Sequence, residues 1–150
     1  MSEQILESSK TFSNYPCAHR RYQHDGHCAW VHGYSRSFTM WFRAKSLTEN
    51  GFVMDFGGMK PVKAWLETMF DHTLLLDTHD PLIPQFRAIE VEGGCKLVIY
   101  EDVGMEGTCK FVADWVSHWL ETETGGRVWL HAIEVRENDK NSARLIRDSK

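Results

Sequence analysis

The chain has 150 residues, of which 42% are hydrophobic and 25% are charged, a composition typical of a soluble protein with one hydrophobic core. We therefore expect a single domain over residues 1–150. The formal net charge of -4 argues against a general nucleic-acid-binding protein, which needs a basic surface. No apolar run approaches the roughly 20 residues that span a membrane, and residues 1–4 lack the basic start of a secretory signal. We expect a cytoplasmic protein whose cysteines are reduced.

The clearest predicted strand is residues 31–44, where apolar and polar side chains alternate with a period of two. Further strands are predicted at residues 4–15, on a weaker pattern, and at 128–135 and 143–146, with a short additional one at 96–100. Helices are predicted where apolar side chains recur every three to four residues, at 59–70 and 108–121. Pro61 is tolerated in the first turn of the first helix. Thr108 is a plausible N-cap of the second helix, and Gly125 follows its expected end.

The order of these elements is strand, strand, helix, helix, strand, strand. It favours an α+β fold with ββααββ order, in which both helices pack on one face of an antiparallel four-stranded sheet. Such a sheet has two open edges, and pairing between subunits is a natural way to cover them.

Histidines are concentrated in one part of the chain. Of the 8 histidines, His19, His24, His27 and His32 lie close together in the sequence and bracket Cys28. Imidazoles beside a thiol are typical of metal sites and of acid–base chemistry. A thiol next to a metal or a protonated imidazole has a lowered pKa and can act as a nucleophile or base, although Cys28 could also be a small buried hydrophobe.

On a strand, His32 and Tyr34 point to the same face, and His19 at the end of the neighbouring strand could reach a metal held there. Three protein ligands and one open position describe a catalytic zinc site. The spacing is equally compatible with His19 and His32 as ordinary polar histidines.

Asp71 and His72 come directly after the first predicted helix. Adjacent residues of a helix do not face each other, so a functional pair requires the chain to leave helical geometry here. The carboxylate could then orient the imidazole for proton transfer; the alternative is a solvated helix end. Later in the chain, the carboxylate of Glu137 could accept two parallel N–H bonds from an amino-pyrimidinone ring, or simply be a surface residue.

In this order, the segments resemble the 6-pyruvoyl/6-carboxytetrahydropterin synthase family. The resemblance covers most of the chain. The matching segments are Cys17-Ala18-His19, Cys28 followed by His32-Gly33-Tyr34, Gly-Phe-Val-Met-Asp-Phe at 51–56, Phe70-Asp71-His72, and Val135-Arg136-Glu137-Asn138.

The resemblance implies the tunnelling fold (T-fold), assembled through sheet edges into rings, usually a homohexamer of two stacked trimers with active sites between subunits. Cys28 is similar to the cysteine that abstracts a proton in this family, and Asp71 and His72 to its acid–base partners. Glu137 is similar to the residue that anchors the pterin, and Thr108 to a residue of the substrate-binding wall.

The resemblance also implies zinc as the cofactor, with His19 and His32 as two of three ligands. Tyr34 stands where the family has the third. A phenol, with a pKa of about 10, is a poor ligand, although a bound cation could lower that pKa. His27 or His24 could replace it, or zinc could be absent.

The implied reaction converts 7,8-dihydroneopterin triphosphate into 6-carboxytetrahydropterin, acetaldehyde and triphosphate, an early step toward queuosine and other 7-deazaguanines. Zinc would act as a Lewis acid on the side chain of the substrate. Alternatives are a 6-pyruvoyltetrahydropterin synthase, a dihydroneopterin epimerase or aldolase, or a non-catalytic paralogue that binds a pterin or guanine. Tyr34 and Lys110, which stands at a family glutamate position, favour the non-catalytic reading.

Overall fold

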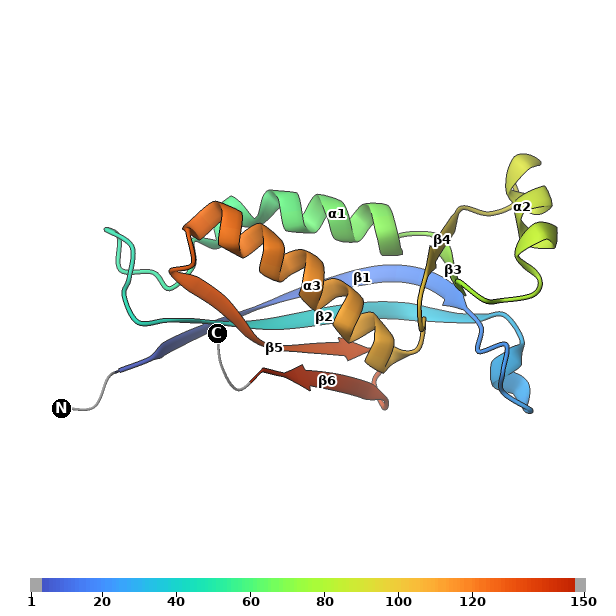
Figure 1. Cartoon of the computed structure of the whole chain (residues 1–150), viewed down its shortest axis with the longest axis horizontal. Coiled ribbons are helices and arrows are strands. Elements are labelled where there is room, and N and C mark those ends of the chain that lie inside the picture. The colour runs from blue at the N-terminus through green and yellow to red at the C-terminus, as the bar shows by residue number, and fades with distance from the viewer. Residues whose placement is uncertain (1–3, 148–150) are drawn as a thin grey trace.

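The computed structural model describes residues 4–147 and has two layers, a twisted sheet and helices that cover one of its faces (Figure 1). The strands are β1 (Leu6–His19), β2 (His32–Ala44), β3 (Thr73–Asp77), β4 (Leu97–Tyr100), β5 (Val128–Arg136) and β6 (Ser142–Ile146). The α-helices are α1 (Lys60–Phe70), α2 (Ile83–Val91) and α3 (Met105–Thr124), and two short 3-10 helices are η1 (His27–Ala29) and η2 (Phe56–Met59). Within this part of the chain, no helix has both the length and the apolar character needed to cross a bilayer.

The sheet is mixed, with the strand order β4-β3-β1-β2-β5-β6. The pairs β1–β2, β2–β5 and β5–β6 are antiparallel, whereas β1–β3 and β3–β4 are parallel. The α+β composition is confirmed, but the expected four-stranded antiparallel sheet is wrong, because β3 and β4 extend it with parallel pairs. The first four residues of β3 are all buried, so the segment lacks the period of two that reveals a strand covered on one face only.

Helix α2 was also missing from the expected ββααββ order. None of its residues is fully buried and only Ile83 and Phe86 pack partly against the core, so its apolar stripe is too short to reveal a helix by periodicity. It lies in the crossover between the parallel strands β3 and β4, a connection that commonly contains a helix. It packs beside this end of the sheet rather than over its centre (Figure 1).

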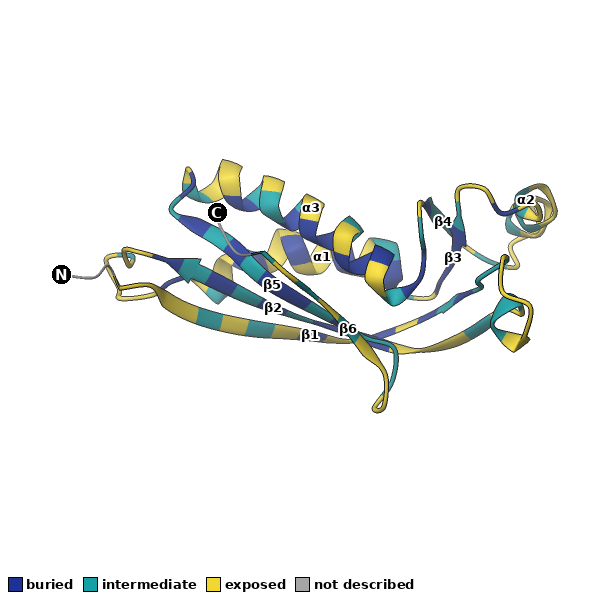
Figure 2. Ribbon diagram, turned by 60° about the horizontal axis from the view of Figure 1, so that its bottom comes forward, coloured by how far each residue is buried: buried dark blue, intermediate teal, exposed yellow. Residues whose placement is uncertain are grey.

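The two helices expected from periodicity are present and cover the sheet side by side. The Trp65 ring of α1 stacks on Trp115 of α3, with ring centroids 4.5 Å apart. Helix α3 begins at Met105 with Gly104 as its N-cap, so Thr108 lies inside the helix and is not the cap. Gly125, with φ of 61°, ends the helix as expected. The buried residues of both helices face the sheet, and the opposite sides are exposed (Figure 2).

A β-bulge in β1 determines which way its last residues point. Phe12 and Tyr15 are both buried although they are three residues apart, and the pairing with β2 shifts between them. Asn14 occupies the left-handed region with φ of 70°, a conformation that asparagine tolerates better than most residues. Because of this shift, Cys17 and His19 are buried on the same side of the sheet as Phe12.

A buried ion pair holds the chain after β1 to the turn before α2. Arg20 donates two hydrogen bonds to Asp80, at 2.7 and 2.9 Å, and a third to the carbonyl of Ala29 at 2.9 Å. The Asp80 side chain is completely buried. Burial alone would raise the pKa of Asp80, but hydrogen bonds from Arg20 and from the backbone N–H of Leu82 outweigh it and hold the pKa below its usual value.

We expect Arg20→Ala to lower the free energy of unfolding by about 3–5 kcal/mol, because it leaves a buried carboxylate without its partner. Urea denaturation at neutral pH measures this. The matched control is Arg87→Ala, since the Arg87–Glu90 pair is exposed and such pairs contribute about 0–1 kcal/mol.

The Asp80 pKa is lowered by folding, so the ionised carboxylate stabilises the fold above the unfolded pKa of about 3.9. This stabilisation is lost as pH falls through the folded pKa. The difference between Arg20→Ala and wild type should therefore shrink in acid; equal losses in the two variants at neutral pH would contradict the assignment.

Candidate active site

Two histidines and one carboxylate meet at one end of the sheet. His19 and His32 are paired across β1 and β2, with ring centroids 4.5 Å apart. Glu137 follows β5, in a turn where its backbone N–H bonds to Asn141. Its Oε1 lies 4.0 Å from Nε2 of His19 and 3.9 Å from Nε2 of His32. We call these three residues the His–His–Glu group.

Gly33 allows the two strands to approach closely beside this group. A Cβ atom at this position would lie 2.5 Å from the carbonyl oxygen of Cys17, which is far closer than real contacts allow. Glycine is therefore required between His32 and Tyr34 for β1 and β2 to keep the pairing that aligns His19 with His32.

The His–His–Glu group could hold a metal ion, because its three ligand atoms lie within 4.8 Å of one another and imidazole and carboxylate are both zinc ligands. The structure thus brings together the predicted ligands His19 and His32. The third member is Glu137, which was expected to anchor the pterin. Tyr34 lies to one side, its ring centroid 6.1 Å from that of His32, and neither His24 nor His27 joins the group within the described residues.

The hydrogen bonds of the two imidazoles determine where their protons lie. Nδ1 of His32 is 2.7 Å from the carbonyl oxygen of Trp30, which only accepts, so Nδ1 carries a proton and the proton of a neutral His32 is on this atom. Nδ1 of His19 is 3.1 Å from the Arg36 guanidinium, which only donates. The proton of a neutral His19 is therefore on Nε2.

The surroundings of His19 favour its neutral form. Burial, followed by the positive charges of Arg36, His32 and Arg21, lowers its pKa to about 3. Its one proton then occupies the nitrogen that faces Glu137, where a zinc ligand would need a lone pair. The ligand kinds suit zinc, but His19 does not fit a three-ligand zinc site while it is bonded to Arg36.

Asp71 and His72 form a second pair. Helix α1 ends at Phe70, Asp71 is extended, and His72 has a positive φ of 59°, so the chain leaves helical geometry as the pair requires. The Asp71 carboxylate accepts a hydrogen bond from Nδ1 of His72 at 2.6 Å. The imidazole is 82% exposed, and its Nε2 is free to exchange a proton with a ligand.

A surface depression of about 430 Å³ includes His72 in its lining, but no member of the His–His–Glu group. Its lining includes Tyr34, Gly33, Cys17 and His72. A ligand in this depression would therefore contact His72 of the Asp71–His72 pair.

The remaining predicted residues are not assembled with these groups. Cys28 is half-buried in η1, and its carbonyl accepts a hydrogen bond from the backbone of Arg21. Among the described contacts, none joins its thiol to Asp71 or His72. Thr108 is fully buried, and its hydroxyl is bonded to Tyr100 and Arg36.

Lys110 lines a different depression of about 400 Å³ on the outer side of α3. The acidic residues around it are Glu101, Asp102 and Asp114. It therefore lies away from the His–His–Glu group in this chain and contributes nothing to the wall beside it.

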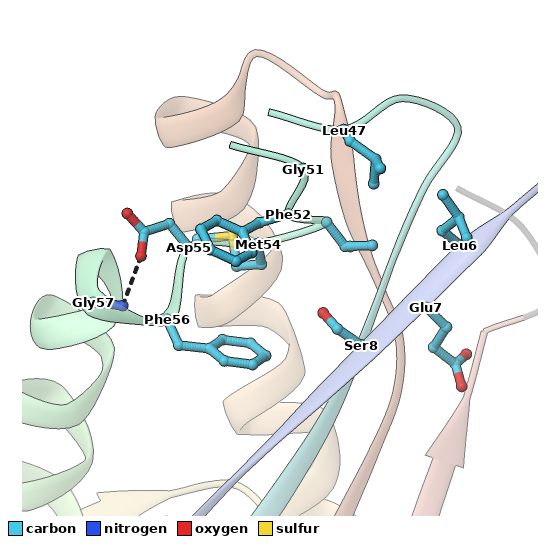
Figure 3. Close-up of a pocket in the computed structure, with 11 residues that line it drawn as sticks. Leu6, Glu7, Ser8, Leu47, Gly51, Phe52, Met54, Asp55, Phe56 and Gly57 are labelled. Atoms are coloured by element: carbon cyan, nitrogen blue, oxygen red, sulfur yellow. Dashed lines mark hydrogen bonds between the residues drawn. The ribbon is translucent and has the colours of Figure 1, made fainter. Parts of the chain in front are cut away.

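Another depression, of about 480 Å³, lies near the opposite end of β1 (Figure 3). Residues 51–57 form much of its lining, together with Leu6 and Leu47. Asp55, in the segment that matched the family pattern, accepts a hydrogen bond from the backbone of Gly57 at 3.0 Å and so caps η2. The surface is mainly apolar and holds no histidine or cysteine, so the chemistry belongs to the His19 end.

Arg36 is the site residue that sequence reasoning missed. It is only 1% exposed, and its signal is present in the sequence, because it occupies the alternating position otherwise filled by Phe38, Met40 and Phe42. A charged residue in an apolar register indicates a specific partner inside the fold.

Comparison with known proteins identifies related chains. A model of the family described as 6-pyruvoyl tetrahydropterin synthase matches residues 8–148. A Rickettsia bellii protein named 6-carboxy-5,6,7,8-tetrahydropterin synthase is 35% identical over 72 residues, which are 47% of this chain and 52% of the relative. A protein of the same name from Aquifex aeolicus is 29% identical over 96 residues, 63% of this chain and 59% of the relative. The matches span about half the length of these curated relatives.

Solved structures share the fold over nearly the whole chain. An uncharacterised protein of Wolinella succinogenes superimposes with a TM-score of 0.81 at 18% identity, covering 97% of this chain and 99% of that one. The 6-pyruvoyltetrahydropterin synthase of Plasmodium vivax gives 0.69 at 15% identity, covering 96% and 98%. At these identities the likeness concerns the fold alone.

Proposed function

Because the chain belongs to the 6-pyruvoyl tetrahydropterin synthase family, we propose that it is a lyase that converts 7,8-dihydroneopterin triphosphate into 6-carboxytetrahydropterin, acetaldehyde and triphosphate. This reaction would serve the synthesis of queuosine and related 7-deazaguanines. The observation that carries the proposal is the Glu137 carboxylate, about 4 Å from two imidazoles, in a chain that also holds the hydrogen-bonded Asp71–His72 pair. The names of the Rickettsia and Aquifex relatives favour the carboxy-type product.

Glu137 is the proposed pterin anchor. Its side chain is only 15% exposed, so a hydrogen bond made there is weakly screened by water. A carboxylate can accept two parallel N–H bonds from the amino-pyrimidinone edge of a pterin. No arginine or lysine is paired with it among the described ion pairs, which leaves its oxygens open to a ligand.

His72 and Asp71 are the proposed proton relay, and Cys28 is the proposed base that removes a carbon-bound proton. The carboxylate of Asp71 fixes His72 with Nε2 toward solvent and stabilises the imidazolium when a proton arrives. Triphosphate is eliminated first, so that the last carbon of the side chain becomes a methyl group. One water molecule then supplies the second oxygen of the new carboxylate as the carbon–carbon bond breaks and acetaldehyde leaves.

Zinc was the cofactor implied by the resemblance. His32 and Glu137 each offer one ligand atom, 3.9 Å apart, and zinc held by them would polarise an oxygen of the substrate. Because His19 presents a proton instead, we assign no step of the reaction to a metal.

Assembly into a homohexamer of two trimers is part of the proposal. Among the described residues, β1 pairs with β2 alone over residues 6–16, and β6 pairs with β5 alone. Both strands are open edges that a second copy could extend. Such an assembly could bring Cys28 of one chain to His72 of the next. Light scattering would then give the mass of a hexamer, and a monomer in solution would exclude this arrangement.

Turnover of 7,8-dihydroneopterin triphosphate by the purified protein, with products identified by mass, tests the function. The expected product is 6-carboxytetrahydropterin. A 6-pyruvoyl product would instead indicate the pyruvoyl-type reaction, and an epimer or a shortened dihydropterin would indicate the epimerase or aldolase reaction. Pterin binding without any turnover would favour the non-catalytic paralogue.

A further inference from the structure

We propose that the groove between α2 and the end of β1 binds the η1 loop, residues 24–30, of a second copy of this chain, with Trp30 in the groove and Asp25 against Lys96. The inference deepens the proposed function and rests on it only for the role of Cys28, which the docked loop carries. Its tests read contacts between chains, so they can fail in an active enzyme and succeed in an inactive one.

The groove has a volume of about 340 Å³ and mainly apolar walls. Val31, Phe86 and Ile89 line it, together with His72 and Lys96. Val31 and Ile89 are exposed, so the described part of the same chain leaves apolar surface here open to solvent. Such a surface is typical of a binding site for another molecule.

The groove lies on the opposite face of the sheet from the His–His–Glu group. Ala18 and Leu74 pack with α2, whereas Cys17 and Leu75 pack in the main core with α1 and α3. Figure 2 shows β3 and β4 between α2 on one side and the ends of α1 and α3 on the other. Successive residues of a strand point to opposite faces, so His19 lies with Cys17, away from the groove. The two groups of one chain therefore act on one substrate only if a second copy takes part.

The η1 loop presents an apolar side chain that suits the groove. Trp30 is 72% exposed, although its indole carries one of the largest apolar surfaces of any side chain. The backbone N–H of Trp30 donates to the carbonyl of His27 at 3.1 Å, and that of Ala29 donates to the carbonyl of Gly26 at 3.1 Å. The loop is thus a compact turn that holds the indole outward. An aromatic side chain in an apolar pocket is the usual anchor of a protein interface.

The loop and the groove also carry complementary charges. Among the described ion pairs, none includes Asp25 or Lys96. Nζ of Lys96 donates one hydrogen bond to the carbonyl of Thr68 at 3.1 Å, which leaves two N–H groups for a partner. Asp25 is exposed in the bend before η1. Opposite charges across an interface select the partner and fix the register.

Both halves of this contact are on one chain, so the partner that complements the groove is a second copy. Insertion of the loop of each copy into the groove of the next is a head-to-tail contact, which closes into a ring when the rotation allows it. Cys28 is two residues from Trp30, and His72 lines the groove that Trp30 enters. The docked loop therefore brings the thiol of one copy toward the imidazole of the other.

Carbodiimide cross-linking of the wild-type protein tests the contact directly. The reagent joins a carboxylate and an amine that touch, as an amide with loss of water. Covalent dimers would be separated on a denaturing gel and their linked peptides identified by mass. We expect an Asp25–Lys96 link in the dimer, lost in Lys96→Gln and retained in Lys60→Gln, which alters an exposed lysine of α1. A dimer without this link, or a link confined to the monomer, would overturn the proposal.

Reversal of the two charges is the second test, with association measured by sedimentation over a dilution series. Asp25→Lys and Lys96→Glu should each weaken association, and Trp30→Ala should weaken it by about 30-fold, as loss of an interface anchor does. The double variant Asp25→Lys/Lys96→Glu should recover most of the loss. Glu49→Lys makes the same charge change in an exposed turn after β2 and should associate as wild type does. Unchanged association in Trp30→Ala, or a folded double variant no better than the single ones, would refute the docking, whereas a lack of lyase activity would not.

Discussion

Replacing Cys28 with alanine should lower kcat by about 10²–10⁴-fold, the usual contribution of a positioned general base, and leave dihydropterin affinity nearly unchanged. Alanine cannot accept the carbon-bound proton, whereas the pterin is proposed to be held by Glu137. Steady-state turnover of 7,8-dihydroneopterin triphosphate and fluorescence titration with a dihydropterin measure the two quantities separately.

The matched control for this variant is Cys95→Ala. Cys95 lines a depression that also includes His72, so it is a rival thiol in the right region. Burial and the charge of Glu90 raise the pKa of its thiol, which makes it a poor source of thiolate. Full turnover in Cys28→Ala would remove Cys28 from the mechanism, and a loss confined to Cys95→Ala would transfer the role to Cys95.

Replacing Glu137 with glutamine should weaken dihydropterin binding by about 10–100-fold, since hydrogen bonds to a charged group contribute about 1.5–3 kcal/mol. Glutamine also turns an N–H group toward the donors of the pterin ring, so one of the two parallel bonds is lost outright. The same fluorescence titration measures the effect, with KM as a second readout.

Glu134→Gln is the control for Glu137→Gln. Glu134 lies on β5, close in sequence, but its carboxylate is paired with Arg136 at 3.3 Å and it does not belong to the His–His–Glu group. It should bind the pterin as wild type does. If both variants bound equally well, Glu137 would not be the anchor.

The sequence predicted most elements that have one buried face. The alternation of Phe38, Met40 and Phe42 indicated β2, and regular apolar spacing indicated α1 and α3. It did not reveal β3 or α2, because β3 is buried without alternation and α2 packs only Ile83 and Phe86 partly against the core. Apolar periodicity reveals an element only where buried and exposed residues alternate regularly along it.

The candidate site was predictable only where the predicted strands themselves place its residues. His19 and His32 could be proposed as neighbours because they lie at the ends of adjacent strands. The position of Glu137 depends on the turn after β5, and the contact between Arg36 and His19 depends on the bulge at Asn14. These are long-range consequences of chain geometry that residue spacing does not encode.

The central claim is that this protein cleaves the side chain of a dihydropterin, and the yield of acetaldehyde per molecule of 7,8-dihydroneopterin triphosphate consumed by the wild-type protein tests it most directly. The account predicts equal amounts of the two, with formation of 6-carboxytetrahydropterin in step. Consumption of the substrate without acetaldehyde, or no consumption by folded protein, would contradict it.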